Sequence, residues 1–140
     1  MHDIILFIQH HMLLSMALAA TLVLLIILEF IKIKKGARTL SPSQAIQYIN
    51  HHKAAVIDIR SYETYLTGHI INSISLPLNE INNKLKKIEK FKTQPLIIAC
   101  ATGSESQRAE KLLTEKGFTS LILSGGIRAW READMPLLKG

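Results

Sequence analysis

The 140-residue sequence predicts a three-layer α/β domain with a mainly parallel central sheet, preceded by one N-terminal transmembrane helix. From residue 41 onward, short apolar segments rich in β-branched residues alternate with segments of helical periodicity, which is typical of βαβ units. Upstream of them, the seventeen residues from Met12 to Leu28 include no charged side chain. Apolar flanks extend this stretch to the ~20 residues that span a bilayer.

Two other interpretations of the apolar stretch fit the sequence less well. A cleaved signal peptide has a basic start and a shorter apolar core, whereas Asp3 is the only charge before this stretch. A core helix that is apolar on all sides would need a larger domain to bury it. We therefore predict a transmembrane helix at 12–31.

Charges on the two sides of this helix predict its orientation. No Lys or Arg precedes it, whereas a juxtamembrane linker at 32–40 carries four basic residues, namely Lys32, Lys34, Lys35 and Arg38. Because basic flanks stay in the cytoplasm, we expect an extracytoplasmic N-terminus at 1–11 and a cytoplasmic domain at 41–140. Much of the net charge of +6 thus belongs to a membrane-topology signal. No basic and aromatic pattern indicates a nucleic-acid partner.

The elements of the domain follow in order. Ser41-Pro42-Ser43-Gln44 combines an N-cap Ser, a Pro at the first helical position and a Gln at the third, so it predicts a helix start. The further expected elements are a helix end at His51-His52-Lys53, an inner strand at 54–59, a helix at 62–67 capped by Ser61 and closed by Gly68, and a strand at 73–76.

The second half continues the alternation of strands and helices. Expected there are a helix capped by Asn79 with an apolar face of Ile81, Leu85 and Ile88, a central strand at 96–99, a helix ending at Gly117, a strand at 120–123, a turn at Gly125-Gly126, and a helix at 127–131. Ligand sites in parallel sheets lie at the carboxyl ends of strands. That location places Cys100, directly after the central strand, at the candidate site.

Cys100 is the only cysteine in the chain, which fits a reducing compartment and excludes an internal disulfide. A loop of small residues follows it, and Ser104 and Gln107 have the spacing of a helix-opening capping box. A strand, a loop and a helix N-terminus would surround the thiol with backbone N–H donors that favour an anion. A small, buried hydrophobic role for Cys100 is equally compatible with this local pattern.

Several short motifs occur along the domain, namely Val56-Ile57-Asp58-Ile59-Arg60, Glu63 to Ile70 with Gly68-His69-Ile70, Ile74-Ser75-Leu76-Pro77, Cys100-Ala101-Thr102-Gly103 with Ser106, and Gly125-Gly126 with Trp130. In this order they resemble a single rhodanese domain covering about residues 39–140. With the N-terminal helix, the chain is similar to small rhodanese-like proteins anchored in the inner membrane of proteobacteria. The resemblance therefore implies a single-pass protein of the bacterial inner membrane whose domain faces the cytoplasm.

The resemblance also implies sulfurtransferase chemistry. The Cys100 thiolate would attack the sulfane sulfur of thiosulfate or of a persulfide, hold it as a cysteine persulfide, and pass it to a thiol acceptor. The implied anion-binding loop comprises Ala101, Thr102, Gly103, Ser104, Glu105 and Ser106. Asp58, Arg60 and His69 are implied to form a hydrogen-bonded framework beneath it. We expect no cofactor and no metal, since the His10-His11 and His51-His52 pairs have no further ligands at a suitable spacing.

Glu105 departs from the family pattern. Members that act on thiosulfate commonly carry Arg at the aligned position, so the charge here is reversed. A carboxylate about 7 Å from the sulfur would disfavour the thiolate by about 2 kcal/mol at an effective dielectric near 20, and less if exposed. It would also repel thiosulfate. Arg108, one helical turn further on, would compensate if it pointed back to the loop.

Two alternative functions follow from the same residues. Glu105 favours a rhodanese fold that has lost turnover and acts as an adaptor for a membrane-protein partner, whereas the retained Cys100 favours a sulfur carrier. An anion or phosphoester site of the related phosphatase type is the weaker alternative, because the resemblance links that activity to a loop one residue longer.

Overall fold

The N-terminal part of the chain contains one long apolar helix. The computed structural model describes residues 7, 10–35 and 39–140, and its contacts divide the chain into two units between residues 36 and 37. Helix α2 (Met12–Lys35) confirms the predicted helix and continues through Lys32, Lys34 and Lys35, which were assigned to the linker. Its segment Met12–Glu29 is long and apolar enough to cross a membrane, and none of it is buried. The predicted N-terminus at 1–11 lies mostly outside the described residues, as do linker residues 36–38.

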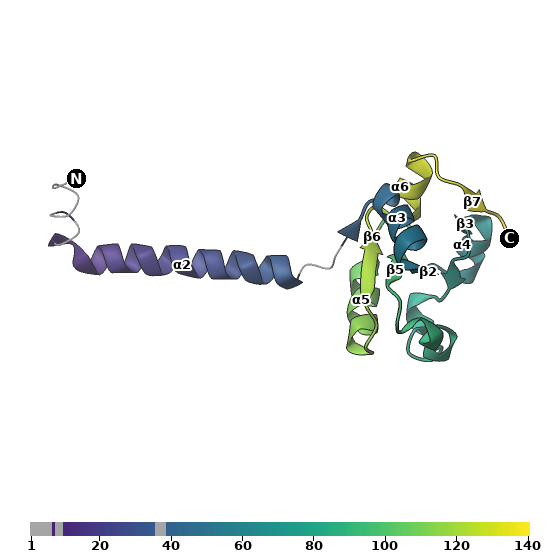
Figure 1. Ribbon diagram of the computed structural model, residues 1–140, viewed down its shortest axis with the longest axis horizontal. Coiled ribbons are helices and arrows are strands. Elements are labelled where there is room, and N and C mark those ends of the chain that lie inside the picture. The colour runs from purple at the N-terminus through teal and green to yellow at the C-terminus, as the bar shows by residue number, and fades with distance from the viewer. Residues whose placement is uncertain (1–6, 8–9, 36–38) are drawn as a thin grey trace. The chain divides into compact units, whose positions relative to one another are not determined.

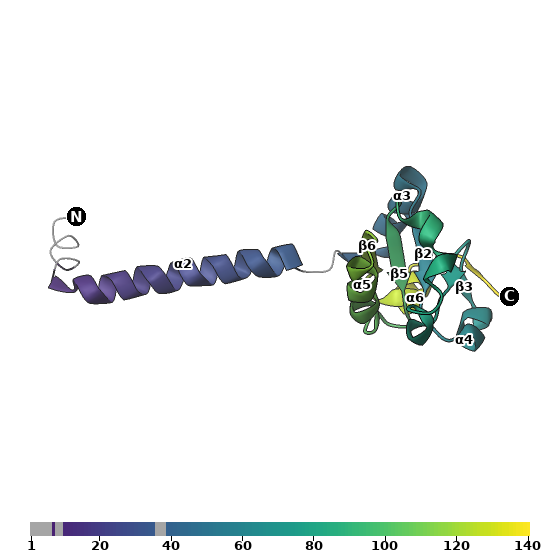
Figure 2. The same cartoon turned by 90° about the horizontal axis from the view of Figure 1, so that it is seen from below.

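A parallel sheet forms the centre of the second unit (Figures 1 and 2). Its strands are β1 (Thr39–Leu40), β2 (Ala55–Asp58), β4 (Ile74–Ser75), β5 (Leu96–Ala99) and β6 (Ser120–Leu123). They lie in the order β1-β6-β5-β2-β4, and every pairing is parallel. The predicted fold class is confirmed, with β5 as the middle strand.

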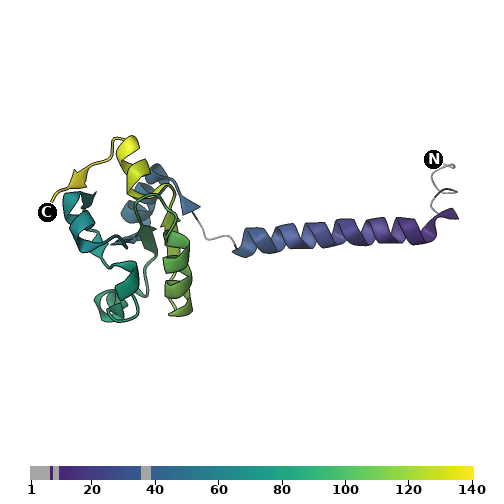
Figure 3. The ribbon, with the colours of Figure 1, turned by 180° about the vertical axis from the view of Figure 1, so that it is seen from behind.

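Helices and turns cover both faces of the sheet. The helices are α3 (Pro42–His52), α4 (Tyr62–Thr67), α5 (Ser106–Glu115) and α6 (Gly126–Glu132). Ala45 of α3 and Trp130 of α6 pack in one apolar cluster, and Ala109 and Leu113 of α5 pack in the other. Figure 3 shows α5 and the turns that precede β5 from the reverse side.

Alternation along β5 determines the direction of the Cys100 side chain. Successive strand residues point to opposite faces of a sheet. Ile97 and Ala99 accordingly belong to the cluster of α3 and α6, whereas Leu96, Ile98 and Cys100 belong to the cluster of α5. The sulfur therefore lies on the face of the sheet that α5 covers.

Several predicted boundaries are confirmed. Ser41 forms a capping box with Gln44 at the start of α3, and Ser61 accepts a hydrogen bond from the Thr64 N–H at the start of α4. Gly117 follows α5 with a φ of 87°. These caps satisfy helix-end groups that would otherwise lack partners.

The predicted helix at Asn79–Ile88 is wrong. Three short 3₁₀ turns occupy this region, η1 (Leu78–Glu80), η2 (Leu85–Lys87) and η3 (Glu89–Phe91), and the first has no side-chain cap. Asn82 and Asn83, which are poor helix formers, interrupt the segment. Ile81 and Ile88 are nevertheless fully buried. The apolar pattern therefore predicted correctly that these side chains are buried, but it did not predict the backbone conformation.

Two further assignments differ from the sequence interpretation. Thr39–Leu40, assigned to the linker, forms β1 because it pairs with Ile122 and Leu123 of β6. A second, antiparallel sheet joins β3 (His69–Ile70) to β7 (Leu137–Leu138), which the sequence analysis did not anticipate. Strands of two residues are too short to show alternation in the sequence.

Burial predicts the effect of shortening a side chain in the sheet. Ile57 of β2 is fully buried, so Ile57→Ala should lower the free energy of unfolding by about 2–5 kcal/mol. Ile71→Ala, at a side chain that is 45% exposed, should cost less than about 1 kcal/mol. Urea titration of the full chain in detergent, followed by the fluorescence of the buried Trp130, measures both. Equal costs would contradict the assigned core.

Candidate active site

The loop after β5 folds around the Cys100 sulfur. The N–H of Gly103 donates a hydrogen bond to Sγ of Cys100 over 2.8 Å. Gly103 has a φ of 93°, a conformation that favours glycine and turns the chain back toward the sulfur. Cys100 itself is only 1% exposed. The thiol is therefore held by the chain that follows it, with a backbone donor on the sulfur.

Other donors of the loop have no partner within the protein. Across residues 39–140, no acceptor is found for the N–H groups of Ala101, Thr102, Ser104, Glu105 and Ser106. The Ser106 hydroxyl is buried and likewise has no hydrogen-bond partner in this described region. A buried polar group such as the Ser106 hydroxyl normally has a hydrogen-bond partner, whereas residues 101, 102, 104 and 105 are exposed. The loop thus carries several donors available to an anion.

Helix α6 supports the loop from the other side. The N–H of Ile127 donates to the Cys100 carbonyl over 2.8 Å, and that of Arg128 donates to the Ala101 carbonyl over 3.1 Å. Gly126, at a φ of 59°, permits this approach because a Cβ there would collide with the Cys100 carbonyl oxygen. The predicted Gly125-Gly126 turn is confirmed, and its role is to hold the cysteine backbone.

The capping box predicted at Ser104 and Gln107 is wrong. Helix α5 begins at Ser106, its N-cap is Glu105, and no side chain caps it. Residues up to 105 remain in the loop because Gly103 turns the chain back to the sulfur. The helix therefore starts one residue later than a Ser104 cap would require, and its first N–H groups have no side-chain cap.

Asp58 and Arg60 form a buried ion pair at the end of the neighbouring strand β2. Arg60 Nη2 lies 2.6 Å from Asp58 Oδ2, and Arg60 Nε lies 2.9 Å from Asp58 Oδ1. Arg60 Nη2 also donates to the Gly68 carbonyl over 2.7 Å. This arrangement ties the end of β2 to the end of α4. Two links lead from it toward the cysteine: Asp58 pairs with Ala99 of β5, and the Ile59 N–H donates to the Ala99 carbonyl.

His69 lies apart from this pair. Its ring stacks on Tyr65 with centroids 3.9 Å apart, and Nδ1 lies 3.1 Å from the Tyr65 carbonyl oxygen. Its backbone belongs to the small sheet formed with β7. Among the described residues, no hydrogen bond joins Asp58, Arg60 or His69 to loop residues 101–106. The three expected framework residues therefore make their hydrogen bonds elsewhere in the domain and not to the loop.

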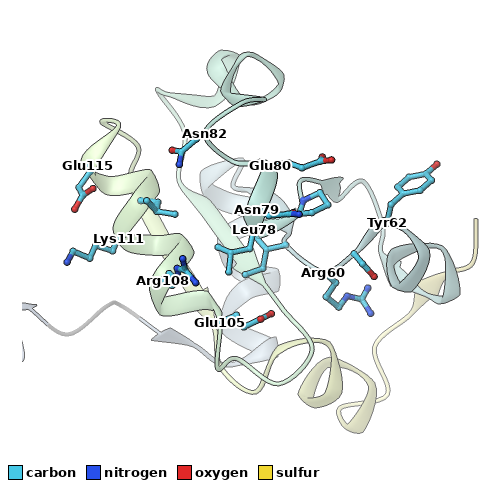
Figure 4. A pocket seen from close by; sticks show the side chains of 14 residues that line it. Arg60, Tyr62, Leu78, Asn79, Glu80, Asn82, Glu105, Arg108, Lys111 and Glu115 are labelled. Atoms are coloured by element: carbon cyan, nitrogen blue, oxygen red, sulfur yellow. The ribbon is translucent and has the colours of Figure 1, made fainter.

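A cleft of about 890 Å³ opens beside the cysteine loop. One wall is α5 and the other is the segment 77–82, as Figure 4 shows. Ile59 and Leu78 line it and also pack in the apolar cluster that contains Cys100. Of loop residues 101–105, Glu105 is the one that lines this cleft.

The charged groups of the cleft fall into paired and unpaired sets. Arg60 is neutralised by Asp58, and Glu80 is paired with Lys84 over 2.6 Å. Glu105 and Arg108 are exposed, and neither side chain has a hydrogen bond or ion pair to any described residue. Further along α5, Lys111 and Glu115 also line the cleft. Arg108 therefore does not neutralise Glu105 within the chain.

Comparison with known proteins assigns the domain. Residues 41–133 match the family model described as Rhodanese-like domain. This chain belongs to the rhodanese-like family. The uncharacterized protein YibN of Escherichia coli (strain K12) is 31% identical over 142 residues, covering 100% of this chain and 99% of that protein. The rhodanese resemblance of the sequence is thus confirmed, and it extends over the N-terminal segment in YibN.

Two further relatives match the rhodanese-like domain. Thiosulfate sulfurtransferase GlpE of Pseudoalteromonas translucida is 34% identical over 95 residues, covering 67% of this chain and 89% of that protein. The crystal structure of a rhodanese-related protein from Thermoplasma volcanium has a TM-score of 0.67 and 27% identity, covering 74% of this chain and 99% of that chain. These relatives place the chain in a sulfurtransferase family.

Sequence reasoning missed the cleft. Its two walls come from segments about 25 residues apart, and one wall was predicted as a helix. The spacing of Glu105 and Arg108 was the one sequence signal for a shared surface, because residues three apart lie on the same side of a helix. The sequence interpretation considered Arg108 only as a partner for the loop.

Removing the buried Asp58 carboxylate should lower the stability of the domain. Asp58→Asn leaves the Arg60 guanidinium buried without its counter-charge, and we expect a loss of about 3–5 kcal/mol in the free energy of unfolding. Glu80→Gln breaks a half-exposed pair with Lys84 and should cost about 1 kcal/mol or less. Denaturant titration compares the two variants, and a similar small loss in both would refute the bracing role.

A methyl group at Gly126 should disturb the cysteine backbone. Gly126→Ala combines an unfavourable φ with a collision at the Cys100 carbonyl. Gly117→Ala is the matched control, since it has a φ of 87° but nothing within 4 Å of the added Cβ. The control should lose about 1–2 kcal/mol of stability from backbone strain. Gly126→Ala should lose at least 1 kcal/mol more, typical of overpacking, and equal losses in thermal or denaturant unfolding would contradict the close contact.

Proposed function

We propose that this protein is a membrane-anchored sulfurtransferase or sulfur carrier in which Cys100 forms a persulfide. The thiolate of Cys100 attacks the outer sulfur of a persulfide R–S–SH, forming a new S–S bond. The S–S bond of the donor breaks, and its electron pair leaves with R–S⁻. In the second half, an acceptor thiolate attacks the same sulfur and restores the Cys100 thiolate. One sulfur atom moves, and no external oxidant is needed.

The single observation that carries this proposal is the donor arrangement at the sulfur. Gly103 N–H already donates to Sγ, and the remaining loop N–H groups and the Ser106 hydroxyl have no partner in the described domain. Preorganised donors of this kind stabilise negative charge without reorganisation. They suit both charged forms of the cycle, the thiolate and the persulfide anion.

Glu105 supports a persulfide rather than thiosulfate as the natural donor. The carboxylate is exposed on the loop and has no counter-charge among the described residues. It repels a dianion more strongly than a donor of lower charge. Natural acceptors in this proposal are thiols.

The membrane location is part of the same proposal. The apolar helix α2 and the basic residues after it support a single-pass protein of the bacterial inner membrane with its domain in the cytoplasm. A second candidate function, an adaptor for a membrane-protein partner, is favoured by one observation, the acidic Glu105 in place of a cation. Nucleic acid is not among the proposed partners.

Mass spectrometry of the full chain separates the two candidates. After mixing with a low-molecular-weight persulfide, Cys100 should gain about 32 Da, one sulfur atom, which a later thiol removes. Cys100→Ser should gain nothing. A wild-type thiol that stays unmodified would refute the carrier function and leave the adaptor.

Reversing the charge at the loop should change the choice of donor. Glu105→Arg should raise the kcat/KM for thiosulfate by about tenfold or more, because a screened carboxylate near the sulfur costs on the order of 1 kcal/mol and the cation adds attraction. Glu63→Arg, at an exposed residue outside the cleft, is the control for net charge. Ordinary wild-type turnover of thiosulfate without a gain in Glu105→Arg would contradict this explanation.

A further inference from the structure

Two unpaired, opposite charges stand together at the end of the cleft nearest the cysteine loop. Glu105 is the N-cap of α5, and Arg108 lies three residues further on the same side of the helix (Figure 4). Side chains at this spacing are about 5–6 Å apart at Cβ. Both side chains are exposed, and neither has a hydrogen bond or ion pair to the other or to any other described residue. A ligand that carries both charges on neighbouring atoms would satisfy both groups.

The other charges around the cleft are either paired or further from the cysteine loop. Arg60 and Glu80 are held by Asp58 and Lys84. Lys111 and Glu115 lie one and more turns further from the loop along α5. Apolar side chains of Ile59 and Leu78 connect the cleft to the cluster that contains Cys100.

We propose that the low-molecular-weight sulfur substrate is a free α-amino acid thiol or persulfide, bound as a zwitterion at the Glu105 and Arg108 end of the cleft. Glu105 accepts hydrogen bonds from the α-ammonium group, and Arg108 donates to the α-carboxylate. This inference rests on the proposed function of Cys100 and names its substrate class. It also gives the charge reversal at Glu105 a positive role, since a cation there could not bind an ammonium group.

In cysteine, for example, the sulfur is bonded to Cβ, which is next to the α-carbon that carries both charged groups. This sulfur enters the loop while both charged groups stay in the cleft. In the transfer to an acceptor, its thiolate attacks the outer sulfur of Cys100–S–SH, a new S–S bond forms, and the bond to Sγ breaks. The electron pair stays on Sγ as the thiolate, and the proton leaves with the product persulfide. A cysteine within a protein lacks both charges, because its amino and carboxyl groups are amides.

Four small thiols test this recognition. The full chain in detergent is loaded with sulfur, and unloading of Cys100 by cysteine, cysteamine, 3-mercaptopropionate and 2-mercaptoethanol is followed by mass spectrometry. The first carries both charged groups, the next two carry the ammonium or the carboxylate alone, and the last carries neither. Each thiol is compared with itself across protein variants, so its intrinsic reactivity cancels. Rates are then divided by the rate with 2-mercaptoethanol, which removes any general effect of a variant on Cys100.

Each variant should affect one charged group of the thiol. Glu105→Gln should lower the normalised rates of cysteine and cysteamine by about tenfold, the usual effect of losing one charge-assisted contact. Arg108→Gln should lower those of cysteine and 3-mercaptopropionate by a similar factor. Glu63→Gln and Lys116→Gln, which remove equal charges outside this cleft, should leave the four rates in their wild-type ratio.

The outcomes separate this inference from the proposed function. If Cys100 never gains sulfur, the carrier function itself is wrong. If Cys100 loads and unloads but the two variants change all four thiols by the same factor, the carrier stands and the zwitterion site is refuted. The zwitterion site would also be refuted if both variants lowered the normalised rate of cysteine but Glu105→Gln left that of cysteamine unchanged, or Arg108→Gln left that of 3-mercaptopropionate unchanged.

Discussion

The hydrogen bond from the Gly103 N–H to the Cys100 sulfur sets the geometry on which the site depends. It exists because β5 ends at Ala99 with its even-numbered side chains facing α5, and because glycine at position 103 lets the loop turn back. The same turn delays the start of α5 to Ser106 and leaves its first N–H groups uncapped. A capping box at Ser104 would have occupied backbone N–H groups that are otherwise available to an anion at the sulfur.

Support for the loop comes from backbone contacts more than from charged side chains. Helix α6 holds the carbonyls of Cys100 and Ala101, and Gly126 permits the close approach. The Asp58–Arg60 pair acts one strand away, where it joins β2 to α4. Its burial means that the pair specifies local geometry, since a buried ion pair contributes little net stability by itself. Charges that are free for a ligand are instead the exposed ones on α5.

Much of this architecture could be predicted from the sequence, and the failures have physical causes. The strands at 55–58, 96–99 and 120–123 are buried on both faces, so their continuous apolar runs were clear signals. The segment 78–91 buries Ile81 and Ile88 as a helix would, yet Asn82 and Asn83 favour short turns. Cys100 and its loop were predicted from position and spacing. The cleft was not, since it depends on how two distant segments pack, which periodicity does not reveal.

A crystal structure of the chain after treatment with a low-molecular-weight persulfide tests the central claim most directly. The account predicts an additional sulfur on Cys100 Sγ, within hydrogen-bonding distance of at least two loop groups among the N–H groups of residues 101–106 and the Ser106 hydroxyl. An unmodified Cys100 would contradict it, as would an outer sulfur that points into the apolar cluster away from these donors.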